Sequence, residues 1–354
     1  MLIEELLELA TYKKASDLHI SAGLPPVIRV DGRLIRVDQQ VLSPDDVESL
    51  VFPMLSNEQR RRLEQEWELD FSYGVQGLSR FRVNIYKDKG SYAAAFRTIN
   101  SVAPSFDTLG LPDIVKKVSD RPRGLVLVTG PTGSGKSTTL ATMIDYINST
   151  RAEHILTIED PIEFVHKSKK SIIHQRELGQ DTRSFSNALR SALREDPDVI
   201  LVGEMRDLET IRLAITAAET GHLVFGTLHT SSASQTIDRI VDVFPEGQQQ
   251  QIRIQLSTVC EGIISQQLVT TKDNKGRIAA TEVMVVTPAI RNLIRENKTF
   301  QIQNTIQTSS NKGMHTMDQD LINLYNKGKI SREIVLNRCS DYNYINKYIE
   351  YMHF

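Results

Sequence analysis

Apolar residues in the second half of the chain form short continuous runs separated by longer amphipathic stretches. Four runs of β character cover residues 125–128, 154–158, 199–202 and 223–228. Runs of this length without alternation indicate strands that are buried on both faces. The stretches between them have helical periodicity, so the chain from residue 109 onward is predicted to form an α/β domain around a parallel sheet.

The first hundred residues follow another pattern, in which apolar and polar residues alternate. Residues 27–37 alternate around Asp31-Gly32, which predicts a hairpin with a type I′ turn. Further elements are expected as helices over 2–13 and after Ser43 and Ser56, and as strands over 69–75, 81–86 and 92–99. Residues 1–99 are therefore interpreted as a small α+β domain, and the aperiodic segment 100–108 as an interdomain linker.

The last third of the chain is predicted to be mainly helical. Residues 263–269 and 277–286 are expected to form paired strands after a helix over 245–260. Helices are then expected over 288–296, 300–308, 316–326 and 331–338. The tyrosine-rich end, 342–354, is amphipathic and is expected to pack against the sheet.

Composition excludes several classes of protein. The 354 residues have a net charge of −2, so no overall basic field favours nucleic acid or a membrane surface. The two cysteines, Cys260 and Cys339, have no metal-binding spacing and suggest no disulfide framework. No apolar run reaches the ~18 residues of a membrane span. We therefore expect a cytoplasmic protein that neither binds nucleic acid nor inserts into the membrane.

One stretch carries a specific chemical signal. Gly130-Pro131-Thr132-Gly133-Ser134-Gly135-Lys136-Ser137 reads G-x-x-x-x-G-K-S, a phosphate-binding P-loop. It follows the apolar run 125–128 and precedes a helix expected from Thr138 to Ile147. The glycines let backbone N–H groups point at a polyphosphate, Lys136 can reach the β- and γ-phosphates, and the Ser137 hydroxyl can bind Mg²⁺. The sequence predicts a nucleoside triphosphate site over residues 130–138.

Carboxylates follow two of the other predicted strands. Glu204 comes after the run 199–202, as in a Walker B element, but Gly203 stands where an aspartate is often found. Glu204 would then have to position Mg²⁺ or water itself. The strand 154–158 leads into an acidic segment with Glu159, Asp160 and Glu163. Ligands of open α/β sheets bind at the carboxyl ends of strands, so both segments are candidates for the site. A surface position is the alternative for each.

Histidines and arginines complete the set of candidates. His222 and His229 flank the strand 223–228, and His229 stands at its carboxyl end, which favours a contact with the γ-phosphate or a polar relay. Arg190 and Arg194 are spaced i, i+4 on a helix expected over 185–195. Phosphate contact and a solvated face remain open for these two. Arg82 and Arg97 each lie within a predicted strand, where the pattern alone favours a solvated face.

Taken together, the motifs resemble one family. The P-loop, the acidic segment 158–164, the segment 193–198 before Glu204 and the histidine segment 220–230 occur in the order found in the secretion ATPases of type II secretion and type IV pili. Ser16-Asp17-Leu18-His19 and Pro25-Pro26 look like the PAS-like N-terminal domain of that family. Residues 289–296 match a C-terminal motif of its pilus-retraction branch. Extension and secretion motors usually have a four-cysteine zinc segment and an additional N-terminal domain. Residues 230–290 hold only Cys260, so no zinc is expected, and 354 residues are too few for the additional domain; both expectations favour retraction.

The resemblance implies a RecA-like ATPase domain over residues 109–354, with a helical tail. It also implies a homohexameric ring that hydrolyses ATP with Mg²⁺, drives pilus retraction and twitching motility, and contacts the platform protein of the inner membrane from its cytoplasmic face. The alternatives are a pilus extension or type II secretion ATPase, and a nucleotide-dependent regulator that does not hydrolyse ATP.

By position in the motifs, the resemblance also implies roles for individual residues. Lys136 would contact the triphosphate, while Ser137 and Glu204 would hold Mg²⁺, partly through water. Glu163 would be the catalytic carboxylate of the acidic segment, although the division of roles between Glu163 and Glu204 stays open. The further candidates are Arg82, Arg97 and His229 for catalysis and His222 for nucleotide binding.

Overall fold

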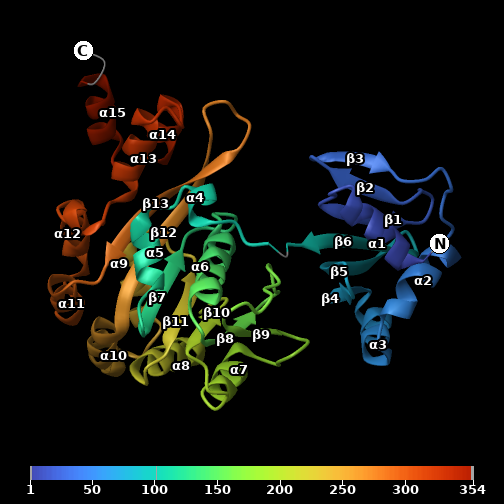
Figure 1. The fold of residues 1–354 in the computed structure, drawn as a ribbon, viewed down its shortest axis with the longest axis horizontal. Coiled ribbons are helices and arrows are strands. Elements are labelled where there is room, and N and C mark those ends of the chain that lie inside the picture. The colour runs from blue at the N-terminus through green and yellow to red at the C-terminus, as the bar shows by residue number, and fades with distance from the viewer. Residues whose placement is uncertain (1, 101, 352–354) are drawn as a thin grey trace. The chain divides into compact units, whose positions relative to one another are not determined.

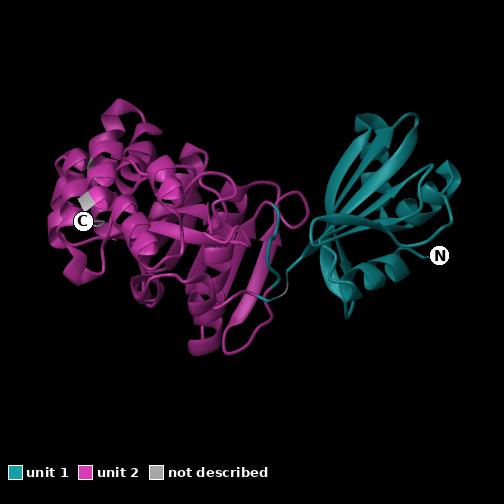
Figure 2. Cartoon of the chain, turned by 90° about the horizontal axis from the view of Figure 1, so that it is seen from above, with its two compact units in different colours: residues 1–102, 161–165 teal, residues 103–160, 166–354 magenta. Residues whose placement is uncertain are grey.

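The computed structural model describes residues 2–100 and 102–351 and divides the chain into two compact units. Unit 1 consists of residues 1–102 and 161–165, and unit 2 consists of residues 103–160 and 166–354 (Figure 2). The first division falls inside the segment predicted as a linker. The return of residues 161–165 to unit 1 was not predicted from the sequence pattern.

Unit 1 is built on a six-stranded antiparallel sheet in the order β3-β2-β1-β6-β5-β4 (Figure 1). The strands are β1 (Asp17–Ser21), β2 (Val27–Val30), β3 (Arg33–Arg36), β4 (Glu68–Val75), β5 (Ser79–Asp88) and β6 (Ser91–Ile99). The helical elements are α1 (Ile3–Tyr12), α2 (Pro44–Val51), the 3₁₀ turn η1 (Phe52–Met54) and α3 (Asn57–Glu66). Leu6 of α1 and Val47 of α2 share one apolar core with Phe81 and Phe96 of the sheet.

Local sequence signals in unit 1 are confirmed. Asp31 and Gly32 both have positive φ, 48° and 78°, as a type I′ hairpin turn requires. Ser43 and Ser56 each form a capping box at the start of α2 and α3. The pattern missed β1, a short strand in which Asp17 and His19 alternate with buried Leu18 and Ile20.

Unit 2 contains a seven-stranded sheet in the order β13-β12-β7-β11-β10-β8-β9. Only β13 runs antiparallel to its neighbour, so the predicted parallel sheet is confirmed. The strands are β7 (Gly124–Thr129), β8 (His154–Glu159), β9 (Ile172–Glu177), β10 (Val199–Val202), β11 (Leu223–Leu228), β12 (Cys260–Thr270) and β13 (Arg277–Val285). Every residue of β7, β10 and β11 is buried, as their unbroken apolar runs predict.

Helices cover both faces of this sheet (Figure 1). One layer consists of α5 (Asp113–Ser119) and α6 (Lys136–Thr150), which pack on Val126 and Val128. The other layer packs on Leu125 and Leu127. It contains α7 (Phe185–Ala192), α8 (Leu208–Glu219), α9 (Ala233–Asp242), α10 (Glu246–Val259), α11 (Pro288–Arg295) and α12 (Ile302–Gln307).

The tail forms a third cluster at the end of the β12–β13 hairpin, drawn in red in Figure 1. It comprises α13 (Met317–Asn326), α14 (Arg332–Arg338) and α15 (Tyr342–Tyr351). Ile345 and Ile349 are fully buried with Val269 of β12 and Ala280 of β13, which confirms the expected packing of the tail. Residues 352–354 lie outside the described residues. Within the described part of the chain, no helix is long and apolar enough to cross a membrane.

Two expectations differ from the structure. The helix expected over 185–195 ends at Ala192, and Asp196 beyond it has a left-handed φ of 52°. Arg190 and Arg194 therefore do not share a helix face, and the i, i+4 argument for them is wrong. Within the segment predicted as a linker, α4 (Phe106–Leu109) forms a single turn capped by Ser105. The short helix was hidden because one turn leaves no visible periodicity.

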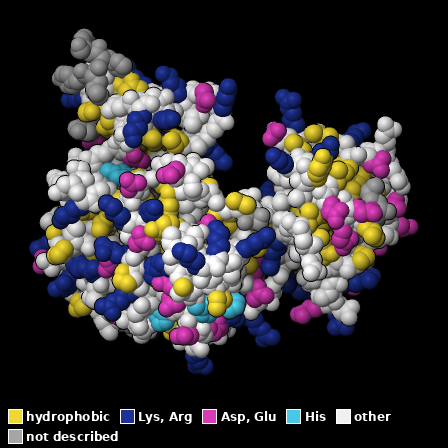
Figure 3. Space-filling view, viewed as in Figure 1, with side chains coloured by type: hydrophobic (Ala, Val, Ile, Leu, Met, Phe, Trp, Pro, Cys, Tyr) yellow, Lys and Arg dark blue, Asp and Glu magenta, His cyan; other side chains and the backbone are white. Residues whose placement is uncertain are grey.

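Charges in both units are mixed in sign. Figure 3 shows Lys and Arg side chains interspersed with Asp and Glu side chains on the face in view. Some of the charges form ion pairs, such as Lys169 with Asp145 at 2.7 Å. The face in view therefore presents no broad basic field of the kind that nucleic-acid binding requires.

Candidate functional site

The P-loop connects β7 to α6 at the carboxyl edge of the unit 2 sheet. Gly130 and Gly135 have φ values of 142° and 90°, which favour glycine. Gly135 is also the N-cap of α6 and has no side chain to satisfy the first N–H groups of that helix. Such N–H groups, with the positive end of the helix dipole, form a site for an anion.

Lys136 is folded onto the loop itself. Its Nζ donates hydrogen bonds to the carbonyl oxygens of Gly130 at 2.8 Å and Pro131 at 3.2 Å. The side chain is buried although it is charged, so the ammonium group is held at the loop by these acceptors. Ser137 and Thr138 follow in the first turn of α6 and are partly exposed. This arrangement can bind a polyphosphate by exchanging carbonyl acceptors for phosphate oxygens around Lys136.

The strand order brings the predicted motifs to one edge. Because β7, β11, β10 and β8 are consecutive and parallel, their carboxyl ends lie next to one another. Backbone bonds tie these ends together, from the N–H of Gly130 to the oxygen of Leu228 at 3.3 Å and from the N–H of Gly203 to the oxygen of Ile158 at 2.7 Å. The P-loop, His229, Glu204 and the start of the acidic segment therefore share this edge.

Glu204 and His229 are in direct contact. The Nε2 of His229 lies 3.1 Å from Oε1 of Glu204, and the same carboxylate oxygen pairs with the guanidinium of Arg206. Burial tends to raise the pKa of Glu204, but the hydrogen bonds and charges of Arg206 and His229 outweigh it, so this pKa is lowered overall. Glu204 is thus held as an ionised carboxylate, which suits a role in orienting water or a hydrated cation.

Gly203, which departs from the common Walker B pattern, has a steric reason here. A Cβ at this position would lie 3.0 Å from the oxygen of Ile158 and 3.1 Å from Cα of Glu159, both of them backbone atoms. Gly203 is thus packed against the end of β8, and an aspartate there would push the two strand ends apart. The carboxylate is supplied one residue later, by Glu204.

His222 lies at the opposite end of the strand. It precedes β11, and its backbone oxygen accepts a bond from the N–H of Gly124 at the start of β7. Its Nδ1 lies 2.8 Å from the oxygen of Ala217 at the end of α8. The structure therefore does not bring His222 to the P-loop of its own chain. Its expected contact with nucleotide stays a prediction that the geometry of one chain does not support.

Three predicted residues belong to unit 1. Arg82 of β5 and Arg97 of β6 are directly opposite each other across the sheet and are exposed. Arg97 pairs with Asp17 of β1 at 2.9 Å, whereas the nearest carboxylate oxygen to Arg82, on Asp70, is 4.0 Å away. Glu163 is exposed on the segment 161–165, which is joined to unit 1 by a bond from Val165 to Asn100. The contact of these three residues with nucleotide stays a prediction.

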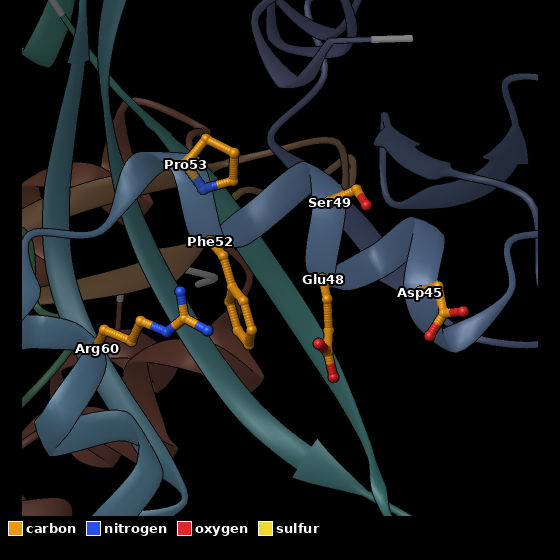
Figure 4. A pocket seen from close by; sticks show the side chains of 6 residues that line it. All are labelled: Asp45, Glu48, Ser49, Phe52, Pro53 and Arg60. Atoms are coloured by element: carbon orange, nitrogen blue, oxygen red, sulfur yellow. The ribbon is translucent and has the colours of Figure 1, made fainter.

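A hollow in unit 1 holds none of the predicted residues. It is lined by side chains of α2, η1 and α3: Asp45, Glu48, Ser49, Phe52, Pro53 and Arg60 (Figure 4). The guanidinium of Arg60 lies 4.7 Å from the centre of the Phe52 ring. The hollow is thus braced by a cation–π contact.

The sequence argument missed one residue at the P-loop and one beside Glu204. Gln266 of β12 bonds to Ser134 in the loop and to Thr139 in α6, and Arg206 bonds to Glu204. Gln266 had a signal that could have been used, since it interrupts the apolar run of a predicted strand with a polar residue. For Arg206, the only signal was its position two residues after Glu204 in the sequence, which does not determine where a long side chain points.

The residues present fit a magnesium ion chemically, although no cluster of three or more His, Cys, Asp or Glu residues that could hold a metal occurs in the described part of the chain. Mg²⁺ typically keeps several waters and takes few protein ligands together with phosphate oxygens. The Ser137 hydroxyl and the ionised Glu204 carboxylate are hard oxygen donors of that kind. Mg²⁺ binding itself remains a prediction.

Comparisons with known proteins agree along almost the whole chain. The family of type II/IV secretion system proteins matches residues 1–335. The type IV pilus retractation ATPase PilT of Pseudomonas aeruginosa is 58% identical over 331 residues, which cover 94% of this chain and 96% of that protein. The type IV pilus ATPase PilU of the same organism is 41% identical, and the alignment covers 97% and 90%.

The fold agrees with a solved relative as well. A crystal structure of the pilus retraction motor PilT with bound ADP superposes with a TM-score of 0.91 at 51% identity, and covers 98% of this chain and 99% of that chain. The match includes both the antiparallel unit and the α/β unit, which confirms the predicted fold class. The P-loop at the carboxyl edge of the sheet agrees with these similarities, and together they show that the chain belongs to the family of type II/IV secretion system proteins.

Proposed function

We propose that this protein is an ATP-hydrolysing motor that powers the retraction of type IV pili and thereby twitching motility. One observation carries the proposal. The chain has a complete P-loop edge, with Lys136, Glu204 and His229, and it is 58% identical over 94% of its length to a protein named as a pilus retraction ATPase. The 41% identity to PilU and the 35% identity to a type II secretion protein E are lower.

The chemistry follows from the charges at the edge. Phosphoryl transfer needs its developing charge to be neutralised and the attacking water to be positioned. Lys136 and the N–H groups of the loop supply positive charge to the phosphates. Mg²⁺, held by Ser137 and through water by Glu204, would supply further charge neutralisation. Glu204 accepts from His229 and can orient a water, and Glu163 is the second carboxylate proposed for this step.

The two arginines of unit 1 are proposed to reach a nucleotide phosphate. Like charges directly opposite in a sheet destabilise it. The facing pair Arg82 and Arg97 therefore has a cost, which Asp17 offsets at Arg97 and which a bound anion would lower further. A guanidinium group can bind phosphate with two parallel hydrogen bonds. We propose that the anion is the nucleotide of a neighbouring subunit in a homohexameric ring, since heterologous contacts that close form rings.

The output of the motor is proposed to pass through α11, which covers residues 289–295 of the segment 289–296 that resembles the retraction motif. Ile290 and Ile294 are fully buried, and Arg291 is bonded to Glu261 at 2.7 Å, so these residues hold the helix in place. Arg295 is exposed on the last turn. We propose that the exposed side of α11 meets the platform protein at the pilus base, at the cytoplasmic face of the inner membrane.

The test is deletion of the gene and complementation with variants. We expect loss of surface motility and an excess of pili, both restored by the wild-type gene. Arg295→Ala should keep a ring of six subunits and most of the ATPase activity but impair retraction. A deletion strain that retracts pili normally would refute the proposed function. An Arg295→Ala protein that retracts normally, or that loses hydrolysis as well, would refute only the role of α11.

A further inference from the structure

We propose that Gln266 is a positioning residue that sets the affinity of the P-loop for nucleotide, by holding the loop from strand β12. The inference rests on the proposed function to the extent that the loop binds ATP or ADP. It concerns a residue of another strand, outside the P-loop sequence. According to this inference, two strands, β7 and β12, together determine the conformation of the phosphate site.

The side chain of Gln266 is buried between two parts of the loop. Its Nε2 donates to the carbonyl oxygen of Ser134 at 2.7 Å, and its Oε1 accepts from the Thr139 hydroxyl at 2.8 Å. Only 3% of the residue is exposed, so water does not compete for these groups. The two partners stand two residues before and three residues after Lys136. Gln266 therefore brackets the residue that is proposed to contact the phosphates.

The backbone of Gln266 touches the loop at a third point. A Cβ at Gly130 would lie 2.1 Å from the oxygen of Gln266 and would overlap it. Gly130 thus needs to be glycine because of β12, and not only because of its own φ. One residue earlier, Ser265 pairs in register with Thr129, and their hydroxyl groups share a buried bond of 2.9 Å. The contacts that β12 makes with the loop therefore extend from the end of β7 to the first turn of α6.

The bond to Ser134 has a direct consequence for phosphate binding. A peptide unit is planar and trans, so its carbonyl and the following N–H point in opposite directions. With the Ser134 carbonyl fixed toward Gln266, the N–H of Gly135 must point away from β12. P-loops bind phosphate through backbone N–H groups that are held in one orientation. The amide of Gln266 thereby orients one such donor before nucleotide arrives.

The amide of glutamine satisfies both partners at once. The Ser134 carbonyl needs a donor and the Thr139 hydroxyl needs an acceptor, and glutamine offers one of each. An ionised glutamate would offer no donor and would add a negative charge beside the phosphates. Methionine keeps a similar shape and length but neither hydrogen bond. These two replacements separate hydrogen bonding from packing.

The chain also offers a matched control. Gln267 is the next residue of β12, and successive side chains of a strand point to opposite faces. Its Nε2 donates to the oxygen of Arg338 at 3.4 Å, at the C-terminal helices. Gln267→Met therefore changes the same strand by the same chemistry without touching the P-loop.

The experiment measures the dissociation constants of ADP and ATP by isothermal titration calorimetry, and the steady-state kinetics, on the full chain. Binding by the wild-type protein tests the proposed function; without it, that proposal fails and the variants are not needed. Given binding, Gln266→Met should weaken the affinity for ADP about tenfold, as expected for two lost hydrogen bonds. It should raise the KM for ATP by a similar factor and change kcat by less than about threefold. Gln266→Glu should weaken binding more.

Thr139→Val removes one of the two bonds from the other side and serves if the Gln266 variants fail to fold. It should weaken ADP binding by about threefold, and the double variant Thr139→Val with Gln266→Met should bind no more weakly than Gln266→Met alone. Gln267→Met should bind like the wild type. Wild-type affinity in Gln266→Met or Thr139→Val, or an equal loss in Gln267→Met, would overturn the inference.

Discussion

The sheets of the two units carry their charged residues in different places. In unit 2, β7, β10 and β11 are buried along their whole length, and Lys136, Glu204 and His229 lie in the segments that follow their ends. In unit 1, burial alternates along β5, and exposed Arg82 lies between buried Phe81 and Val83. A sheet covered on both faces has no room for charge except at its edge, whereas a sheet with one open face can present charge along its strands.

This difference decides how a site can be found. At a covered sheet, the end of an apolar run marks the place where a polar residue can act, so P-loop and strand-end residues stand out in the sequence. On an open face, a polar residue at every second position is the ordinary pattern of a solvated surface. Arg97 looks no different from its neighbours until its cross-strand partners, Asp17 and Arg82, are known.

The largest expected effect tests the covered sheet. Leu127 of β7 is fully buried, so Leu127→Ala should destabilise the protein by about 2–5 kcal/mol. Leu34 of the edge strand β3 is 59% exposed, and Leu34→Ala should change stability by no more than about 0.5 kcal/mol. Urea denaturation followed by far-ultraviolet circular dichroism measures both. Equal losses would mean that the two sheets do not differ as described.

The next effect tests the strand ends of unit 2. Lys136→Ala and Glu204→Ala should each reduce ATP turnover by at least roughly a hundredfold, because each removes a charge from the proposed site of phosphoryl transfer. Melting temperatures close to that of the wild type would show that the fold is kept. Glu209→Ala is the control, since Glu209 is an exposed carboxylate of α8 paired with Arg190. Near wild-type turnover in Lys136→Ala or Glu204→Ala would refute the assignment.

A smaller effect tests the open face of unit 1. Arg97→Ala should lower ATP turnover about tenfold if its guanidinium reaches phosphate, since a hydrogen bond to a charged group contributes about 1.5–3 kcal/mol. Arg29 pairs with the same Asp17, at 3.8 Å, and Arg29→Ala is the matched control that removes a charge without the proposed role. Turnover that falls equally in both variants would assign the effect to Asp17 and to the fold of unit 1.

The smallest effect concerns the pH dependence of that ion-pair cluster. Burial tends to raise the pKa of Asp17, but the hydrogen bonds of Ser16 and Arg97 and the charge of Arg97 lower it overall. A carboxylate with a lowered folded pKa stabilises the fold above its unfolded pKa of about 3.8, and this stability is lost as pH falls through the folded value.

Asp17→Asn should therefore be less stable than the wild type at neutral pH, by less than about 1 kcal/mol because Arg97 is exposed and Arg29 is partly exposed. The difference should shrink as pH falls below about 3.8. Denaturation curves at a series of pH values measure it. A difference that grows toward acid pH would contradict the assigned sign.

The sequence anticipated those parts of the molecule in which local chemistry decides the structure. The helix starts at Ser43 and Ser56, the type I′ turn and the P-loop context are of this kind, and so is the edge shared by Glu204 and His229. Strand β9 was missed because its exposed residues, such as Ile172 and His174, remove the apolar run. Gln266 was missed because its role depends on residues more than 120 positions away, which only the sheet order brings near.

The sequence pattern also did not predict how deeply each side chain is buried. The helical spacing in 288–295 marks Ile290, Leu293 and Ile294 alike, yet Ile290 and Ile294 are fully buried and Leu293 only partly. The loss expected from Leu293→Ala is therefore below the range that applies to a fully buried leucine. Periodicity gives the face of a helix, but the depth depends on which neighbouring helix covers each turn.

The C-terminal helices α13, α14 and α15 have an apolar core of their own, built on the end of the β12–β13 hairpin and separate from the two cores of the sheet. Segments that have an apolar core of their own tend to unfold and refold locally as cooperative units, at a free energy below that of global unfolding. The amide hydrogens of these three helices should then exchange with solvent as one group, earlier than those of β7 and β11. Under repeated mechanical load, these three helices would therefore unfold before the rest of unit 2, and the phosphate site would stay assembled.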